Sequence, residues 1–446
     1  MTRNWAGNHT YTGTLVRPGS LDEAADVVAG AEHVRAVGSR HSFNDIVDSE
    51  ATLVSLERLA YRHPSLHPDD EDLERSGGLR DDDGGGQPGG TEPELDALTG
   101  RVRVSAATRY ADLARFLEDH GRTLPNFASL PHIGIAGAVA TATHGSGTDN
   151  AALASSVVRL ELISADGTER TIDRDVDGDT LNGATVSLGA LGLVHTLTLE
   201  TVPAFDVAQT VYGPVPFAAL ADAFDDVSAL GYSVSCFTTL SSNAFDTVWV
   251  KQVHDPDSPH AAPESVLGVP ALTAETHPIP GIDPANCTPQ LGAPGPAADR
   301  LPHFRADQLP SAGEEIQCEY LVPRHSARLA LHALANLAEP LAGLVQVCEV
   351  RSVAADLAWM SPMYGQPCVG IHFTLVRDPA RVGAVLPLIE EAFGVLGGRP
   401  HWGKVSAADP DRVRGRYPRR EDFLDLVRTH DPDRTFTNPF VRRWVG

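Results

Sequence analysis

The sequence predicts an α+β protein of two or three domains, and three observations indicate this. At about 150 residues per domain, a chain of 446 residues is long enough for two or three domains. Short apolar runs typical of strands alternate with segments of helical periodicity. A strand-like run ends near residue 205, where we place a domain boundary.

The first 60 residues have the pattern of a β–α–β unit. We expect strands at 13–18 (GTLVRP), 33–38 (HVRAVG) and 51–59 (ATLVSLERL). After the first of these strands, Ser20 is followed three residues later by Glu23. This spacing is a capping box, which predicts the start of a helix.

Further along, residues 100–126 predict a strand followed by a helix. Residues 155–173 predict a hairpin, because the Asp166–Gly167 pair favours a tight turn, and residues 188–205 predict a long returning strand. The second half alternates strands and helices. It is interrupted at 255–312 by a Pro/Gly-rich segment, and a loop of that length is typically functional or wraps a domain surface.

Residues 64–97 form a low-complexity block rich in Asp, Gly, Pro and Glu. Such a composition does not bury enough apolar surface to offset the entropy lost on ordering. We expect a disordered or loosely held surface insertion between two strands, with no part in the chemistry.

The composition excludes several classes of partner. A net charge of −24 disfavours nucleic acid and anionic membranes, which require a basic patch. No apolar run approaches the roughly 18 residues that span a bilayer, and the N-terminus lacks a hydrophobic signal region. Five cysteines without CxxC spacing indicate reduced thiols, so we expect a cytoplasmic protein with no metal site. No feature of the sequence indicates an obligatory protein partner.

Several familiar catalytic motifs are missing. The chain has no GxGxxG after its first strand and no GxxxxGK[ST], so a Rossmann or P-loop site has no support. The THGSG run is not a GxSxG nucleophile elbow, and metal-ligand spacings such as HExxH are also missing. A hydrolase built on Ser42, His41 and Asp45 is disfavoured, because such close sequence neighbours do not readily align as nucleophile, base and orienting acid.

Two loops of small residues are suited to close approach of a ligand. Exposed peptide N–H groups and helix starts in such loops favour a pyrophosphate, although tight helix–strand packing explains either loop alone. Two such loops in one domain favour a dinucleotide. The first comprises Gly38, Ser39, Arg40, His41 and Ser42; the second runs through Gly134, Gly137, Ala138, Ala140, Thr141, Thr143, His144, Gly145 and Gly147.

Two apolar strands in the second half carry polar pairs. Alternation places Glu349 and Arg351 on one face, and His372 and Thr374 on one face of a second strand. We expect that face of the first strand to include Val345, Val347 and Val353 as well. An unpaired charge there would be costly, so these groups either pair with one another as a structural cluster or bind a substrate.

The lysines are few enough to single out. The sequence holds two, Lys251 and Lys404, and Lys404 lies beside His401 and Trp402 in an apolar run. Acid, guanidinium, imidazole, hydroxyl and ammonium groups together suit a polyol, and a histidine or lysine of lowered pKa can take an alcohol proton. Since no nicotinamide motif is present, a flavin is the economical hydride acceptor.

In combination, several motifs resemble the alditol (xylitol/sorbitol) oxidases of the vanillyl-alcohol-oxidase superfamily of FAD flavoproteins. The motifs are GSRHSFN, LPNFASLPHIGIAGAVATATHGSG, SLGALGLV, CEVRSVAAD, HFT and RPHWGK, with NWAGN near the start and FTNPF near the end. The resemblance covers nearly the whole chain apart from the block at 64–97. Aldonolactone oxidases share the flavin half.

The resemblance implies an FAD-binding domain of two α+β subdomains formed by both chain ends, with an α+β substrate-binding cap between them. We place the FAD domain at 1–205, the cap at 206–404, and a segment returning to the FAD domain at 405–446. The histidine of the GSxHS motif, His41, is expected to bond covalently to FAD. Arg40, which is glycine in some relatives, either reaches the FAD phosphate or points to solvent.

The resemblance also implies the site residues. Those expected to contact FAD are Gly38, Ser39, Arg40, His41, Ser42, Ser129, Gly134, Gly137, Thr141, Ala142, Thr143, His144, Val194 and His401. Those expected to bind the polyol are Ser129, Glu349, Arg351, Thr374 and Lys404, and those expected to act in catalysis are His372, Lys404, Glu349 and Arg351. Ser129 is included by resemblance only.

The predicted reaction is oxidation of the terminal CH–OH of an alditol to the aldose, with hydride transfer to flavin N5 and reoxidation by O₂ to H₂O₂. Two alternatives stay open. A sugar-1,4-lactone oxidase or dehydrogenase of the gulono- or arabinono-lactone type would keep the flavin half and change the substrate. A polyol- or flavin-binding protein without activity would keep both sites.

Overall fold

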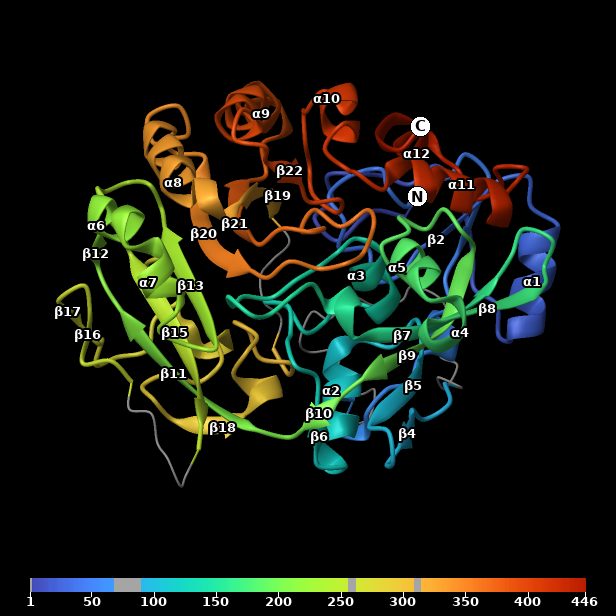
Figure 1. Cartoon of the computed structure of the whole chain (residues 1–446), viewed down its shortest axis with the longest axis horizontal. Coiled ribbons are helices and arrows are strands. Elements are labelled where there is room, and N and C mark those ends of the chain that lie inside the picture. Colours follow the sequence, from blue (N-terminus) through green and yellow to red (C-terminus); the bar gives the residue numbers. More distant parts are fainter. Residues whose placement is uncertain (1, 68–89, 256–261, 309–313) are drawn as a thin grey trace.

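The computed structural model describes residues 2–67, 90–255, 262–308 and 314–446, and Figure 1 shows how its elements are arranged. One large sheet and its helices fill the left part of the view, while two smaller sheets and both chain ends fill the right part. No helix in these described ranges is long and apolar enough to cross a bilayer.

Both chain ends contribute to the part with the two smaller sheets. A parallel sheet has the order β1-β3-β2, and an antiparallel sheet has the order β4-β5-β9-β7-β8. The backbone N–H of Val34 donates to the carbonyl oxygen of Thr435, so the C-terminal segment packs on the parallel sheet. The strands are β1 (Thr14–Val16), β2 (Val34–Ala36), β3 (Thr52–Val54), β4 (Glu94–Asp96), β5 (Arg101–Ser105), β7 (Val157–Ile163), β8 (Glu169–Asp173) and β9 (Leu193–Glu200).

The large sheet has eight antiparallel strands in the order β18-β11-β15-β13-β20-β21-β19-β22. They are β11 (Asp206–Tyr212), β13 (Ser233–Thr238), β15 (Thr247–His254), β18 (Pro294–Pro296), β19 (Glu315–Pro323), β20 (Val345–Val353), β21 (Cys368–Val376) and β22 (Arg399–Pro400). Three two-stranded ladders complete the strands: β6 (Arg122–Thr123) with β10 (Val202–Pro203), β12 (Val215–Pro216) with β14 (Ala244–Phe245), and β16 (Ser265–Val266) with β17 (Val269–Pro270).

One face of the large sheet is covered by helices. Side chains such as Ile316, Val350 and Ile371 pack with Leu331 of α8 and Ile389 of α9 in one buried apolar cluster, to which α6 and α7 also contribute. The opposite face is left for other contacts. The helices are α1 (Leu21–Ala29), α2 (Tyr110–Asp119), α3 (Ile135–Ala140), α4 (Arg174–Asp177), α5 (Asp179–Thr185), α6 (Phe217–Asp222), α7 (Phe224–Ser228), α8 (Ala327–Asn336), α9 (Pro379–Gly394), α10 (Pro410–Arg414), α11 (Arg420–His430) and α12 (Pro439–Trp444).

Several predicted elements are confirmed. Helix α1 begins after Ser20, whose hydroxyl accepts from the N–H of Glu23. The Glu23 carboxylate accepts from the backbone N–H of Gly19, whereas in a capping box it would accept from the N–H of Ser20. The hairpin β7–β8 turns at Gly167, which has φ +80°, a conformation that glycine adopts without steric cost.

Other expectations are wrong in part. The expected strand 51–59 is strand only at 52–54, and 57–59 is a 3₁₀ helix; the expected strand 188–205 begins only at Leu193. The ends of the block 64–97 are ordered, with a 3₁₀ helix at Pro64–Leu66 and β4 paired to β5, because neighbouring strand and helix partners are available there. Its centre lies outside the described residues.

Candidate active site

A large cavity lies between the two small sheets and the face of the large sheet opposite the helix-covered cluster. Its wall includes the 35–56, 106–144 and 187–194 regions on one side, and β19, β20, β21 and the 401–404 region on the other. The predicted site residues that line it are Gly38, Ser39, Arg40, His41, Ser42, Ser129, Gly134, Gly137, Thr141, Thr143, His144, Val194, Glu349, Arg351, His372, Thr374, His401 and Lys404.

Strand alternation explains why one face of the large sheet is polar. On β20 the side chains of Cys348 and Val350 enter the apolar helix-covered cluster, so Glu349 and Arg351 point the other way. The expectation for Val345 is wrong: a register shift between Val345 and Val347 places Val345 against the helix-covered cluster. A bulge of this kind reverses the facing of every residue beyond it.

The register brings the polar residues of three strands together. His372 of β21 is paired with Glu349 of β20 on one side and with Glu319 of β19 on the other. Arg351 is paired with Gly370, and a Cβ at that glycine would lie 3.5 Å from an Oε1 atom of Glu319. The missing side chain therefore leaves room for Arg351 to reach across to Glu319.

Glu319 is the hub of this polar face. Its carboxylate accepts hydrogen bonds from Arg351 Nη2 at 2.9 Å and from His372 Nδ1 at 3.2 Å, and it lies 3.3 Å from His144 Nε2. Although burial opposes its charge, Arg351 and the two histidines hold the pKa of Glu319 well below its usual range. A carboxylate only accepts, so the proton of neutral His372 is on Nδ1 and its Nε2 keeps a lone pair.

Arg351 also connects the site to Glu349 and Ser129. Its Nη1 donates to the Ser129 hydroxyl oxygen at 3.1 Å and lies 3.6 Å from Glu349 Oε2. Burial disfavours the cation, yet Glu349 and Glu319 raise the pKa of Arg351. Burial likewise disfavours the charge of Glu349, but Arg351 and His303 hold the pKa of Glu349 below its usual range. Both groups are therefore charged.

His372 and Lys404 have lowered pKa values. Burial lowers the pKa of His372, and the Glu319 carboxylate opposes this, so the imidazole is neutral near pH 7. Burial lowers the pKa of Lys404 to about 8, with Glu319 opposing. Lys404 donates to the Gln317 amide oxygen and its ammonium lies 4.9 Å from the centroid of the Phe43 ring.

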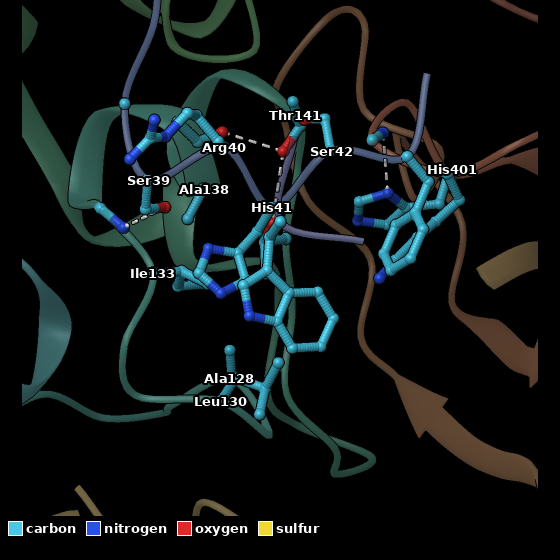
Figure 2. Close-up of a pocket in the computed structure, with 18 of the residues that line it drawn as sticks. Ser39, Arg40, His41, Ser42, Ala128, Leu130, Ile133, Ala138, Thr141 and His401 are labelled. Carbon is cyan, nitrogen blue, oxygen red and sulfur yellow. Dashed lines mark hydrogen bonds between the residues drawn. The ribbon is translucent and has the colours of Figure 1, made fainter. Parts of the chain in front are cut away.

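The loop at 38–42 lies against the small-residue loop at 128–144. Figure 2 shows Ser39, Ala138 and Ile133 gathered on one side of His41 and His401 on the other. The Ser39 hydroxyl oxygen accepts from the N–H of Gly134 at 3.1 Å, which joins the two loops.

His41 is held in this cavity without a hydrogen bond at its Nδ1, which is buried and has no partner among the described residues. The indole of Trp5 stacks on the imidazole, with ring centroids 5.3 Å apart. Burial, helped by the Arg109 charge, lowers the pKa of His41 to about 3, so the imidazole is neutral. A Cβ added at Gly38 or Gly137 would meet no atom within 4 Å. The backbone of these two glycines therefore borders an open space beside His41.

The structure differs from the predicted site in a few residues. Ala142 is buried and has φ +56°, and it turns the chain without lining the cavity. Sequence reasoning missed Glu319, Gln317 and His303, which line it. The strand EIQCEYLVP places a polar residue at every second position up to Glu319, which is the same signal that identified Glu349 and Arg351.

Comparisons with known proteins agree with this geometry. The chain is 42% identical to an alditol oxidase of a Streptomyces species, over 98% of this chain and 97% of the relative. The chain belongs to the alditol oxidase family. An L-gulono-1,4-lactone dehydrogenase of Mycobacterium tuberculosis is 27% identical over 99% of this chain and 98% of its own length.

Family models and a solved structure add to this. A model described as FAD binding domain matches residues 93–173, and one described as D-arabinono-1,4-lactone oxidase matches residues 312–444. A solvent-stable cholesterol oxidase has the same fold, with a TM-score of 0.73 at 15% identity, covering all of this chain and 97% of that one. The predicted FAD-binding α+β fold with its cap is confirmed, and the chain binds FAD.

Proposed function

We propose that this protein is an FAD-dependent alditol oxidase that converts the terminal CH–OH of a polyol such as xylitol or sorbitol to the aldose, with O₂ as acceptor and H₂O₂ as product. One observation carries the proposal. A single cavity is lined by Glu349, Arg351 and Thr374 of the large sheet and by Ser129 of the 128–144 loop, in a chain 42% identical to an alditol oxidase.

The FAD site is formed by the two small-residue loops. Gly38 and Gly137 leave open space, and His41, whose Nδ1 is without a hydrogen-bond partner in the described residues, lines a cavity that has room for a large ligand. We place the covalent bond to FAD on His41, since its neutral imidazole carries a free lone pair. When bound, FAD would supply the acceptor for the hydride that leaves C1, with O₂ as the final electron acceptor.

The substrate hydroxyls bind to the charged groups of the sheet. Glu349 accepts hydrogen bonds, Arg351 donates them, and the hydroxyls of Ser129 and Thr374 do both. Because Glu349 and Arg351 are already paired and buried, they are ordered before a substrate arrives. A preordered set of donors and acceptors binds a chain of hydroxyls with little further loss of entropy.

The proton chemistry is assigned to His372 and Lys404. Glu319 holds the proton of His372 on Nδ1, which leaves Nε2, 3.4 Å from the Thr374 hydroxyl, as the acceptor of the ring; Nε2 accepts the proton of the C1 hydroxyl. Lys404, protonated below about pH 8, donates to the same oxygen and stabilises the charge that develops as the proton leaves. Loss of this proton and of hydride from C1 converts CH–OH into C=O.

The domain limits and location follow as part of the proposal. The FAD domain comprises 1–205 with 405–446, and 206–404 is the substrate-binding cap; the strands of the large sheet all lie in the second range, which supports this division. The five cysteines are free and buried, which supports a location in the cytoplasm. The net charge of −24 argues against nucleic acid as a partner.

A sugar-1,4-lactone oxidase is the second candidate, because the D-arabinono-1,4-lactone oxidase model covers β19, β20 and β21. A substrate panel with peroxide detection separates the two. Purified yellow protein is given xylitol, sorbitol, and L-gulono- and D-arabinono-1,4-lactone at equal concentrations. Peroxide and aldose from the alditols are expected, whereas turnover of the lactones alone would overturn the proposal.

A further inference from the structure

Lys251 is the second of the two lysines, and its ammonium group is completely enclosed. It lies on β15 with 0% of its surface exposed. Its Nζ contacts three acceptors: the carbonyl oxygens of Leu301 at 2.6 Å and Pro302 at 3.1 Å, and Nδ1 of His303 at 3.1 Å. An ammonium has three N–H donors, so each one has a partner. The long 262–308 segment supplies all three. Burial lowers the pKa of Lys251 to about 7, with the Glu349 charge opposing, so the side chain carries all three donors below that pH.

This arrangement fixes the state of His303. Its Nδ1 accepts from Lys251, so the ring proton is on Nε2, which donates to Glu349 Oε1 at 2.9 Å. Phe237 and Trp249 pack edge-on against the same ring, with centroids 5.3 and 5.5 Å away. The imidazole is therefore held in one orientation and one tautomer.

We infer that Lys251 is a positioning residue that acts through His303 to hold the Glu349 carboxylate in the orientation that binds substrate hydroxyls. The inference rests on the proposed function. One oxygen of Glu349 is occupied by His303 and the other lies beside Arg351, so the remaining lone pairs have fixed directions. Burial also lowers the pKa of His303 to about 4, with the Lys251 charge adding to the effect, which keeps the ring neutral.

Removing the Lys251 ammonium changes which group of His303 faces the Glu349 carboxylate. In Lys251→Met, Nδ1 of His303 loses its donor, and so do the carbonyl oxygens of Leu301 and Pro302. The ring proton can then move to Nδ1, which leaves the lone pair of Nε2 against Oε1 of Glu349. The carboxylate loses its donor and turns, so polyol binding weakens while the groups at C1 stay in place.

The experiment compares full-length, FAD-loaded Lys251→Met with wild type in steady-state turnover of xylitol. We expect KM to rise about tenfold, as for loss of one charge-assisted hydrogen bond, with kcat changed less than about threefold. The matched control is Gln209→Met. Gln209 is the register partner of Lys251, is fully buried, and donates to the carbonyls of Thr288 and Pro289 in the same segment. It does not contact His303, and its KM should equal that of wild type.

A double-mutant cycle separates positioning from general structural support. Glu349→Gln alone raises KM, and adding Lys251→Met to it should raise KM no further, because the pathway ends at Glu349. If Lys251→Met does not fold, His303→Gln and His303→Leu answer the same question. Gln keeps an N–H donor toward Glu349 and should retain low KM, whereas Leu should not.

Three results would overturn the inference: unchanged KM in folded, yellow Lys251→Met; additive effects in the cycle; or equal KM for His303→Gln and His303→Leu. Failure of wild type to oxidise xylitol or sorbitol is a different result. It would overturn the proposed function itself, and the inference with it.

Discussion

Replacement of Glu319 by Gln tests the hub of the polar face. The carboxylate accepts from Arg351 at 2.9 Å and from His372 at 3.2 Å. An amide has one oxygen and one NH₂ group, so whichever way it turns, one of these two donors loses its acceptor. Each such bond to a charged group contributes about 1.5–3 kcal/mol. We therefore expect kcat/KM to fall about 10- to 100-fold.

The pH dependence of kcat/KM reports the effect of Glu319→Gln on His372. The Glu319 charge raises the pKa of His372, so its removal lowers that pKa further. The base is active when deprotonated, and the acid limb of kcat/KM therefore moves to lower pH in Glu319→Gln. The assay is peroxide release from xylitol across the pH range, together with the rate of flavin bleaching without oxygen.

The control for this prediction is Glu390→Gln. Glu390 accepts from the Tyr320 hydroxyl at 2.6 Å and from the Ser406 hydroxyl at 2.7 Å. Tyr320 is adjacent to Glu319 on β19, but it packs in the helix-covered cluster. The control should lose stability without a change in kcat/KM. A folded, FAD-loaded Glu319→Gln with wild-type kcat/KM and an unmoved acid limb would refute the reasoning.

Three further predictions concern other parts of the site. Because Lys404 acts as a cation with a pKa of about 8, wild-type kcat/KM should fall as pH rises through about 8. Lys404→Met should lose this alkaline limb together with most activity. If the alkaline limb persists in Lys404→Met, it belongs to the titration of another group. Arg351→Lys should raise the KM for xylitol about tenfold or more, because an ammonium lacks the forked donors with which the guanidinium binds Ser129 and Glu319 at once. An unchanged KM in a titration with xylitol would contradict this. His41→Ala should yield a white pellet after acid precipitation while wild type gives a yellow one, and a white wild-type pellet would exclude the covalent bond.

Local patterns in the sequence predict much of the fold and part of the site. The hairpin β7–β8 and the capped helix α1 are set by neighbouring residues, so they are predictable. The facing of Glu349 and Arg351 follows from strand alternation alone. The same alternation places Val345 on the wrong face, because the bulge that reverses its facing depends on pairing with β21, a distant segment.

The rest of the site depends on contacts between distant segments. Glu319 becomes a hub only because β19 pairs with β21, which places it opposite His372. His303 reaches Glu349 from a Pro/Gly-rich segment whose path is set by Lys251 and the sheet rather than by its own periodicity. The ends of the 64–97 block are ordered by β5, which pairs with β4, and by α2, whose Asp112 contacts His67, rather than by local composition.

The central claim is that an alditol reduces the flavin in this cavity. The most direct measurement is the absorbance of the bound flavin when xylitol or sorbitol is added to the purified protein without oxygen. The account predicts that the yellow colour is bleached by either alditol, returns on admitting air with release of H₂O₂, and is unaffected by an aldonolactone at the same concentration. Bleaching by the lactone alone, or by none of these compounds, would contradict it.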